Sequence, residues 1–211
     1  LNIDVTSPTN AGMIVTGQST GTAESVNVTN GDYGVLVSTS GSGSLDLKNL
    51  DLDGQAKAGV YYAKDVSGEL TGSFTNIAGP AIGYGASTSS DVEFSDLTIV
   101  GNDVGIETAG SGKITIQDST FSNTNNDFVI TGSSVIDFIE GDLGLSTVDV
   151  TGSGKLNRMR IANITVTADS STVADTAVVV RDGNGNIQGV QTTDSNGKAS
   201  GITFITDVVS S

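Results

Sequence analysis

Gly34-Val35-Leu36-Val37 is the stretch that decides the fold, because the chain returns to it at nearly even intervals. Similar stretches begin at Gly12, Gly59, Ala81, Gly105 and Phe128. In chain order, the steps between the six starts are 22, 25, 22, 24 and 23 residues. A short apolar strand with this period is typical of a repeat architecture. Each unit is too short to bury its apolar face, so it needs stacked neighbours.

A second set of apolar residues lies between successive copies, at fixed offsets from their starts. The offsets are 11, 13, 16 and 18 residues, which gives Leu45, Leu47, Leu50 and Leu52 after Gly34 and Val92, Phe94, Leu97 and Ile99 after Ala81. This pattern predicts about three short strands in each unit, with alternate side chains pointing inward. Wound into coils, the strands are expected to stack about 4.8 Å apart as three parallel sheets around an apolar interior.

Three asparagines occupy corresponding places 17 or 18 residues after their unit starts, namely Asn30, Asn76 and Asn123. Asn tolerates left-handed backbone and bonds to its own chain at turns. The three residues therefore predict a ladder of turns along one corner of the coils.

By coil length and strand pattern, residues 1–144 resemble the right-handed parallel β-helix family, the solenoid of pectate lyases and many microbial surface proteins. The resemblance implies an all-β fold whose main part is a right-handed parallel β-helix of about six coils. Because a fold does not imply a function, the activity stays open at this point.

The rhythm breaks after Gly144, and residues 145–155 are interpreted as a last irregular coil or a linker. A Val-rich strand at residues 177–180, the hairpin turn at 182–186 and a second turn at 192–197 follow. This pattern resembles the small Ig-like or carboxypeptidase-regulatory-type β-sandwich domains found between β-helices in archaeal and bacterial surface proteins. The resemblance implies a small β-sandwich over residues 156–211. Because this segment is short for such a domain, a partner chain or further sequence is expected to complete it.

The formal net charge of −15 is concentrated in the repeat region. Residues 1–144 hold 18 Asp and Glu against 4 Lys, a net of −14, whereas residues 145–211 hold 6 against 5, a net of −1. Such a field repels nucleic-acid phosphates and anionic lipid headgroups. No stretch of about 20 apolar residues is present, so no membrane insertion is expected. Residues 1–6 read as a strand, which suggests a processed mature protein or an excised piece of a longer one.

The residue types present weigh against catalysis. The chain has no His and no Cys, which excludes Ser-His-Asp and Cys-His machinery. A pectate-lyase-like enzyme would need an Arg or Lys base beside a calcium-binding Asp cluster, yet residues 1–144 contain no Arg. Two clusters of acidic residues could supply the carboxylate pair of a glycosidase, namely Asp51 with Asp53, and Asp91 with Glu93 and Asp96. Strand alternation places these acids on outward faces or in turns, so a polysaccharide lyase or hydrolase is the disfavoured alternative.

One loop has the beginning of a calcium site. Asp182, Asn184 and Asn186 match the first three ligand positions of an oxygen-rich calcium loop. Thr192 stands where a bidentate Glu is expected, and a hairpin turn is needed here in any case. The sequence favours a turn, with calcium as the only candidate cofactor.

Two stretches, Asn27-Val28-Thr29 and Asn163-Ile164-Thr165, match the N-glycosylation sequon. In each, the Asn is flanked by apolar residues that point inward on a strand, so the Asn is expected to point outward. Asn27 and Asn163 are therefore candidate sites for a glycan.

The sequence favours a non-enzymatic structural module of a secreted or cell-surface protein: a surface layer, an extracellular filament or a surface-protein repeat. Strand-like stretches at residues 1–6 and 202–209 suggest assembly through strand edges and solenoid ends, with copies of the chain or neighbouring domains as partners.

The alternative is an adhesin or carbohydrate-binding solenoid. Tyr33, Tyr61, Tyr62 and Tyr84 all fall around the opening strands of successive coils. Tyr61 and Tyr62 are adjacent on a strand, so one of them is expected to be buried. Packing inside the solenoid is therefore the favoured use of these rings.

Overall fold

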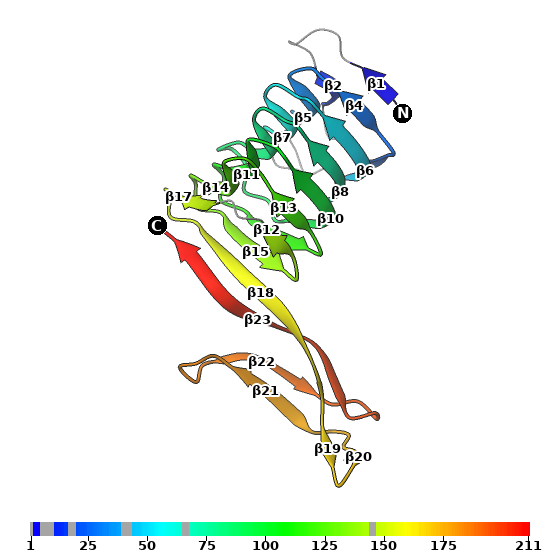
Figure 1. The fold of residues 1–211 in the computed structure, drawn as a ribbon, viewed down its shortest axis with the longest axis vertical. Helices are drawn as coiled ribbons and strands as arrows, with labels where there is room; N and C mark the ends of the chain where they lie inside the picture. Colours follow the sequence, from blue (N-terminus) through cyan, green and yellow to red (C-terminus); the bar gives the residue numbers. More distant parts are fainter. Residues whose placement is uncertain (1, 5–10, 17–19, 39–43, 65–67, 144–146) are drawn as a thin grey trace. The chain divides into compact units, whose positions relative to one another are not determined.

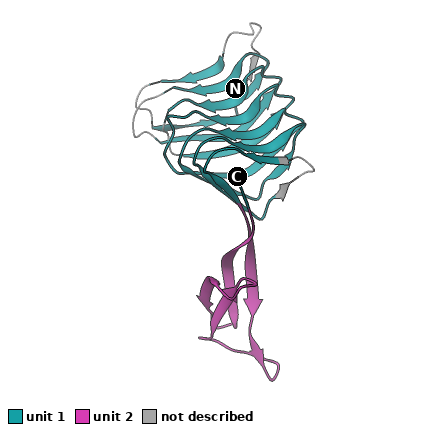
Figure 2. Ribbon diagram, turned by 90° about the vertical axis from the view of Figure 1, so that its left-hand side faces the viewer, with its two compact units in different colours: residues 1–156, 209–211 teal, residues 157–208 magenta. Residues whose placement is uncertain are grey.

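The computed structural model describes residues 2–4, 11–16, 20–38, 44–64, 68–143 and 147–211. All regular secondary structure assigned within these ranges is β-strand. The described residues therefore contain no helix long and apolar enough to cross a membrane. The chain divides into two compact units, drawn in different colours in Figure 2. One comprises Leu1–Leu156 with Val209–Ser211, and the other Asn157–Val208.

The first unit is a parallel β-solenoid of about six turns, which confirms the architecture expected from the repeat (Figure 1). One wall is a seven-stranded sheet in the order β17 (Thr147–Val150), β14 (Asn126–Ile130), β11 (Val104–Thr108), β9 (Pro80–Tyr84), β7 (Ala58–Tyr62), β5 (Tyr33–Val37) and β2 (Ala11–Val15). The six copies of the recurring apolar stretch supply the six strands from β2 to β14.

The rest of the solenoid wall belongs to one larger sheet. Its main path is β1 (Asn2–Asp4), β4 (Asn27–Thr29), β6 (Leu45–Asp53), β8 (Glu69–Thr75), β10 (Val92–Val100), β12 (Lys113–Gln117) and β15 (Val135–Ile139), followed by β18 (Lys155–Thr165) and β23 (Lys198–Ser210). Beside this path lie β3 (Gly21–Glu24), β13 (Thr120–Ser122) and β16 (Asp142–Leu143).

The solenoid has two sheets instead of the three expected, because the chain turns one corner of each coil within a single residue and the strand continues past it. Asn49 and Asp96 each have a φ of 52° in the middle of the nine-residue strands β6 and β10. One left-handed residue turns the chain there, and the ladder continues on both sides with a local shift of register. Two faces of the solenoid thus share one sheet.

The predicted turn ladder is confirmed for two of its three asparagines. Asn30 and Asn76 have φ values of 62° and 53°, and Gly54 and Gly101 adopt the same left-handed backbone in the coils that follow each of them. Asn123 does not have a positive φ. Its side chain is buried and accepts a hydrogen bond from a neighbouring coil.

The core forms as the offsets predicted. All eight residues at the offsets 11, 13, 16 and 18 after Gly34 and Ala81 are buried, none of them more than 7% exposed. Further along the solenoid, the rings of Phe121, Phe128 and Phe138 pack against one another with centroids 4.8 to 5.7 Å apart. The stacked coils therefore enclose one continuous apolar interior.

The sixth copy of the opening strand begins one residue earlier than the sequence predicted. Ile106 pairs with Phe128, which places Asp127 rather than Phe128 opposite Gly105. Asp127 is fully buried and accepts hydrogen bonds from the backbone and side chain of Asn123. A polar residue thus occupies a place where the other copies have Gly or Ala, and sequence similarity alone does not align it.

Residues 147–150, within the stretch interpreted as a last coil or linker, form β17 and pair in parallel with β14. Val148 lies opposite Phe128 and Val150 opposite Ile130, so this segment continues the seven-stranded sheet. Residues 145 and 146 lie outside the described residues.

The second unit is a small separate sheet region. Its long strands are β18 and β23, and the Val-rich stretch forms β21 (Ala177–Arg181), which pairs antiparallel with β22 (Ile187–Thr192). A shorter antiparallel pair joins β19 (Thr167–Ala168) to β20 (Ser171–Thr172). The expected hairpin is confirmed. Besides the long pair, the described strands of this unit form two separate two-stranded sheets, β19–β20 and β21–β22.

Candidate functional site

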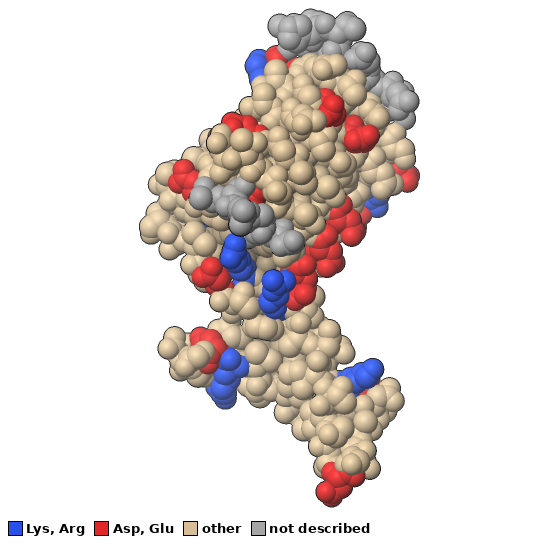
Figure 3. All heavy atoms as spheres, viewed as in Figure 1, with Lys and Arg blue, Asp and Glu red and all other residues tan. Residues whose placement is uncertain are grey.

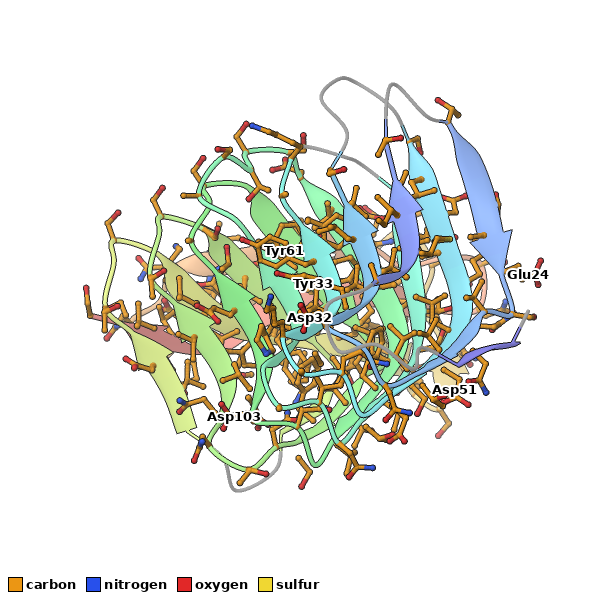
Figure 4. The ribbon with its side chains drawn as sticks, turned by 90° about the horizontal axis from the view of Figure 1, so that it is seen from above. Glu24, Asp32, Tyr33, Asp51, Tyr61 and Asp103 are labelled. Carbon is orange, nitrogen blue, oxygen red and sulfur yellow. The ribbon has the colours of Figure 1, made fainter. Side chains whose placement is uncertain are left out.

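The acids considered for a glycosidase hold neighbouring coils together. Asp51, labelled in Figure 4, accepts a hydrogen bond from the side-chain amide of Asn27 at 3.2 Å. Asp53 accepts one from the Thr75 hydroxyl at 2.8 Å and one from the Asn76 side chain at 2.7 Å. Each of these donors lies one coil away. Asp51 and Asp53 therefore act as rungs between coils on the outer face of β4, β6 and β8.

Two acids of the other cluster, Asp91 and Glu93, line a groove of about 420 Å³ on the outer face of β6, β8 and β10. Its lining is Ser44, Asp46, Lys48, Gly68, Glu69, Asp91, Val92 and Glu93. Asp96 is at the corner of β10, where it adopts left-handed backbone. Acidic side chains outnumber Lys and Arg on the solenoid face drawn in Figure 3.

One lysine partly neutralises this groove. The Lys48 ammonium lies 2.7 Å from the Glu69 carboxylate and 3.9 Å from that of Asp46. The hydrogen bond with Glu69 raises the pKa of Lys48 above its usual value. The Asp91 carboxylate accepts the backbone N–H of Lys113 at 2.8 Å. In the described part of the chain, no three His, Cys, Asp or Glu side chains gather as a metal site.

The four tyrosines divide into an inner pair and an outer pair. Tyr62 and Tyr84 are buried and stack with ring centroids 4.7 Å apart and an interplanar angle of 8°. Burial raises the pKa of both phenols. Tyr33 and Tyr61 are only partly buried, with centroids 5.8 Å apart and an angle of 44°. The alternation argument is confirmed, and Tyr62 is the inward member of its pair.

The outer pair belongs to a patch that we call the tyrosine surface: Tyr33, Tyr61 and Pro80, on β5, β7 and β9, with the buried Gly83 of β9 against the Tyr61 ring. Asp32 ion-pairs with Lys57 at 2.7 Å, and the Lys57 ammonium lies 5.7 Å from the centre of the Tyr33 ring. Figure 4 labels Asp32, Tyr33 and Tyr61, which lie close together. The patch thus combines aromatic rings with one charged pair at its edge.

The candidate calcium loop is a hairpin turn with its own hydrogen bonds. One Asp182 oxygen accepts the backbone N–H groups of Asn184 and Asn186, each at 2.9 Å. The other accepts the side chains of Asn186 at 2.9 Å and Gln188 at 3.3 Å. The hydrogen bonds from Asn186 lower the pKa of Asp182. A cation bound here would have to replace several of these donors.

The two sequon asparagines differ in exposure. Asn27, in β4, is partly buried, and its side-chain nitrogen is the atom that donates to Asp51. Asn163, in β18, is exposed, and its side-chain oxygen accepts the N–H of Gly201 at 3.1 Å. A glycan on Asn163 would leave that acceptor in place, whereas one on Asn27 would replace a donor hydrogen.

Sequence reasoning missed two buried amides that hold a corner of the solenoid. Gln55 and Asn102 each follow a left-handed glycine, and both are fully buried. The Gln55 amide donates to the carbonyls of Val28, Asn30 and Asp53 at 3.0 to 3.2 Å. The only signal in the sequence is a polar residue directly after the turn glycine, which resembles an ordinary loop.

Comparisons of the chain with protein-family models, with curated proteins and with solved structures gave no match.

Proposed function

We propose that this chain is a non-enzymatic structural module of a secreted or cell-surface protein, such as a surface layer, a filament or a surface-protein repeat, and that copies assemble through strand edges. The observation that carries the proposal is the exposure of apolar side chains on the hairpin β21–β22. Val179 and Val190 lie opposite each other in it and are 42% and 58% exposed, and nearby Ile187 is 56% exposed.

The hairpin also has free edges. Among the described strands, β21 and β22 pair only with each other. An isolated two-stranded hairpin is marginally stable in water, and an exposed apolar edge strand is a template for pairing with another chain. A further strand at either edge would extend the hydrogen-bonded ladder and place its own side chains beside the exposed apolar ones.

Charge favours the C-terminal region as the place where copies meet. Residues 1–144 have a net charge of −14, so two solenoid walls repel each other, whereas residues 145–211 have a net charge of only −1. We therefore assign the occupant of the hairpin edge to a second copy of this chain. Among the described strands, β2 and β17 end the seven-stranded sheet and are further edges for the same kind of contact.

The proposal includes finer assignments that rest on resemblance. The coil length and parallel stacking support a right-handed, pectate-lyase-like β-helix, and the Val-rich hairpin supports an Ig-like or carboxypeptidase-regulatory-like second domain. An extracellular or cell-surface location follows from the same resemblance. The proposal also includes glycans attached to Asn163 or Asn27.

The experiment compares Val190→Asp with Val100→Asp by light scattering and electron microscopy over a concentration series. Val100 is a matched control, because it is a 37% exposed valine on the solenoid strand β10. We expect the parent chain and Val100→Asp to associate and Val190→Asp to stay monomeric. A monomeric parent chain at every concentration, or equal association of both variants, would contradict the proposal. Intact mass of native material in sugar-sized increments above 21.3 kDa would test the glycans.

A further inference from the structure

Gly83 has no conformational reason to be a glycine. It lies inside strand β9, and its φ is not positive. Glycine weakens a strand interior and often marks a place where another group approaches closely. A Cβ at Gly83 would lie 2.7 Å from Cδ2 and 3.1 Å from Cε2 of Tyr61. The missing side chain therefore makes room for the Tyr61 ring.

The Tyr61 ring leans along β9 towards the next glycine. A Cβ at Gly85 would lie 3.1 Å from the Tyr61 hydroxyl oxygen. The ring thus follows the strand from Gly83 to Gly85 and keeps part of its area in solvent. Its position is set by the backbone of β9 on one side and by Tyr33 at 5.8 Å on the other. Such a ring is held in place before any ligand arrives.

Charged residues lie at one end of the rings and on the strand next to β9. The Asp32–Lys57 ion pair lies at the Tyr33 end of the tyrosine surface. Glu107 is in register with Gly83 on the next strand, β11, and is partly exposed. Preordered aromatic rings stack on the apolar face of a sugar ring, and neighbouring carboxylates and ammonium groups bond to its hydroxyls.

We infer that the tyrosine surface binds a neutral polysaccharide, a property that goes beyond the assembly role proposed above. The net charge of −14 on residues 1–144 disfavours an anionic polysaccharide. A linear chain that crosses the strands would place successive sugars over Tyr33 and Tyr61, on neighbouring coils. A protein ligand, the competing possibility, would need only apolar contact and would accept an aliphatic side chain in place of Tyr61.

The test is affinity electrophoresis of the full chain in native gels that contain glucomannan, dextran or hydroxyethylcellulose, with alginate as the anionic contrast. We expect at least one neutral polymer to retard the parent chain and alginate to leave its mobility unchanged. Tyr61→Leu is expected to weaken binding about tenfold, the equivalent of about 1.4 kcal/mol of lost stacking. Tyr61→Phe keeps the ring and is expected to bind like the parent.

Val129→Ala is the matched control, because Val129 is a partly exposed residue in register with Glu107 on the same sheet face. Thermal unfolding followed by circular dichroism verifies that each variant folds. The inference is overturned if no neutral polymer retards the parent, if alginate retards it equally, or if Tyr61→Leu binds like Tyr61→Phe. Equal weakening by Val129→Ala overturns it as well. None of these outcomes depends on whether copies of the chain associate.

Discussion

Asn102 connects three coils of the solenoid through one buried side chain, and replacing it tests how the corners are held. Its oxygen accepts the backbone N–H of Ile77 at 3.0 Å. Its nitrogen donates to the Phe74 carbonyl at 2.9 Å and to the Asn123 side-chain oxygen at 3.1 Å. Asn102 itself is fully buried. Asn102→Leu keeps a side chain of similar length and removes all three hydrogen bonds.

The expected cost follows from these contacts. A buried polar group that loses its partner costs about 1–3 kcal/mol, and Asn102→Leu takes a partner from three such groups. Burial of the leucine side chain returns about 1–2 kcal/mol. At about 2 kcal/mol for each of the three groups and a return of about 1.5 kcal/mol, we expect a loss of about 4–5 kcal/mol in the free energy of unfolding, a large share of the roughly 5–15 kcal/mol of a typical domain.

Urea unfolding followed by far-UV circular dichroism measures this loss, because the chain has no Trp for fluorescence. Asn125→Leu is the control: Asn125 is exposed, and its side chain donates to the Asp103 carboxylate on the surface. We expect the control to change stability by less than about 1 kcal/mol. If both variants lose the same stability, Asn102 does not hold the corner and the reasoning is refuted.

Two further predictions concern the core and the close approach of coils. Burial raises the pKa of Tyr62, so the unfolded chain loses this proton first, near pH 10, while the folded chain keeps it. The stability that Tyr62 contributes is complete below that pH and falls by about 1.4 kcal/mol per pH unit above it. Tyr62→Phe lacks this proton, so its free energy of unfolding in urea should fall less steeply than that of the parent chain between about pH 9 and 11. An equal slope against pH in the two chains would contradict this prediction. A Cβ at Gly59 would lie 2.6 Å from the Ala81 carbonyl oxygen, so Gly59→Val should cost about 1–3 kcal/mol or more by overpacking. Gly183→Val, at a glycine with no neighbouring atom within 4 Å of its Cβ, is the control in thermal unfolding, and equal melting temperatures would refute the prediction.

The architecture of the solenoid could be predicted from the sequence because its signal is local. Side chains alternate along each strand, and the chain repeats one pattern at a period of 22 to 25 residues. Leu47 and Phe94 are therefore recognisable as inward residues before any coil is built, and both are buried. The C-terminal hairpin was predictable for the same reason, since the turn at residues 182–186 carries its own hydrogen bonds.

The candidate surfaces could be predicted only in part. The alternation of Tyr61 and Tyr62 requires one ring to be inside, yet only the packed coils decide that it is Tyr62. The place of the Tyr61 ring depends on Gly83, which is one coil away. Likewise, the exposure of Val190 depends on which strands lie over the hairpin, and the strand pattern does not contain that information.

By itself, the sequence determined the strands, their period, the sign of the charge and the absence of His and Cys chemistry. The tertiary structure alone decided the register of Asp127, the single-residue corner at Asn49 and the hydrogen bonds of Asn102. The physical reason is distance along the chain. Alternation and turn chemistry act between near neighbours, whereas these features depend on partners about 20 or more residues away, which meet only when the coils stack.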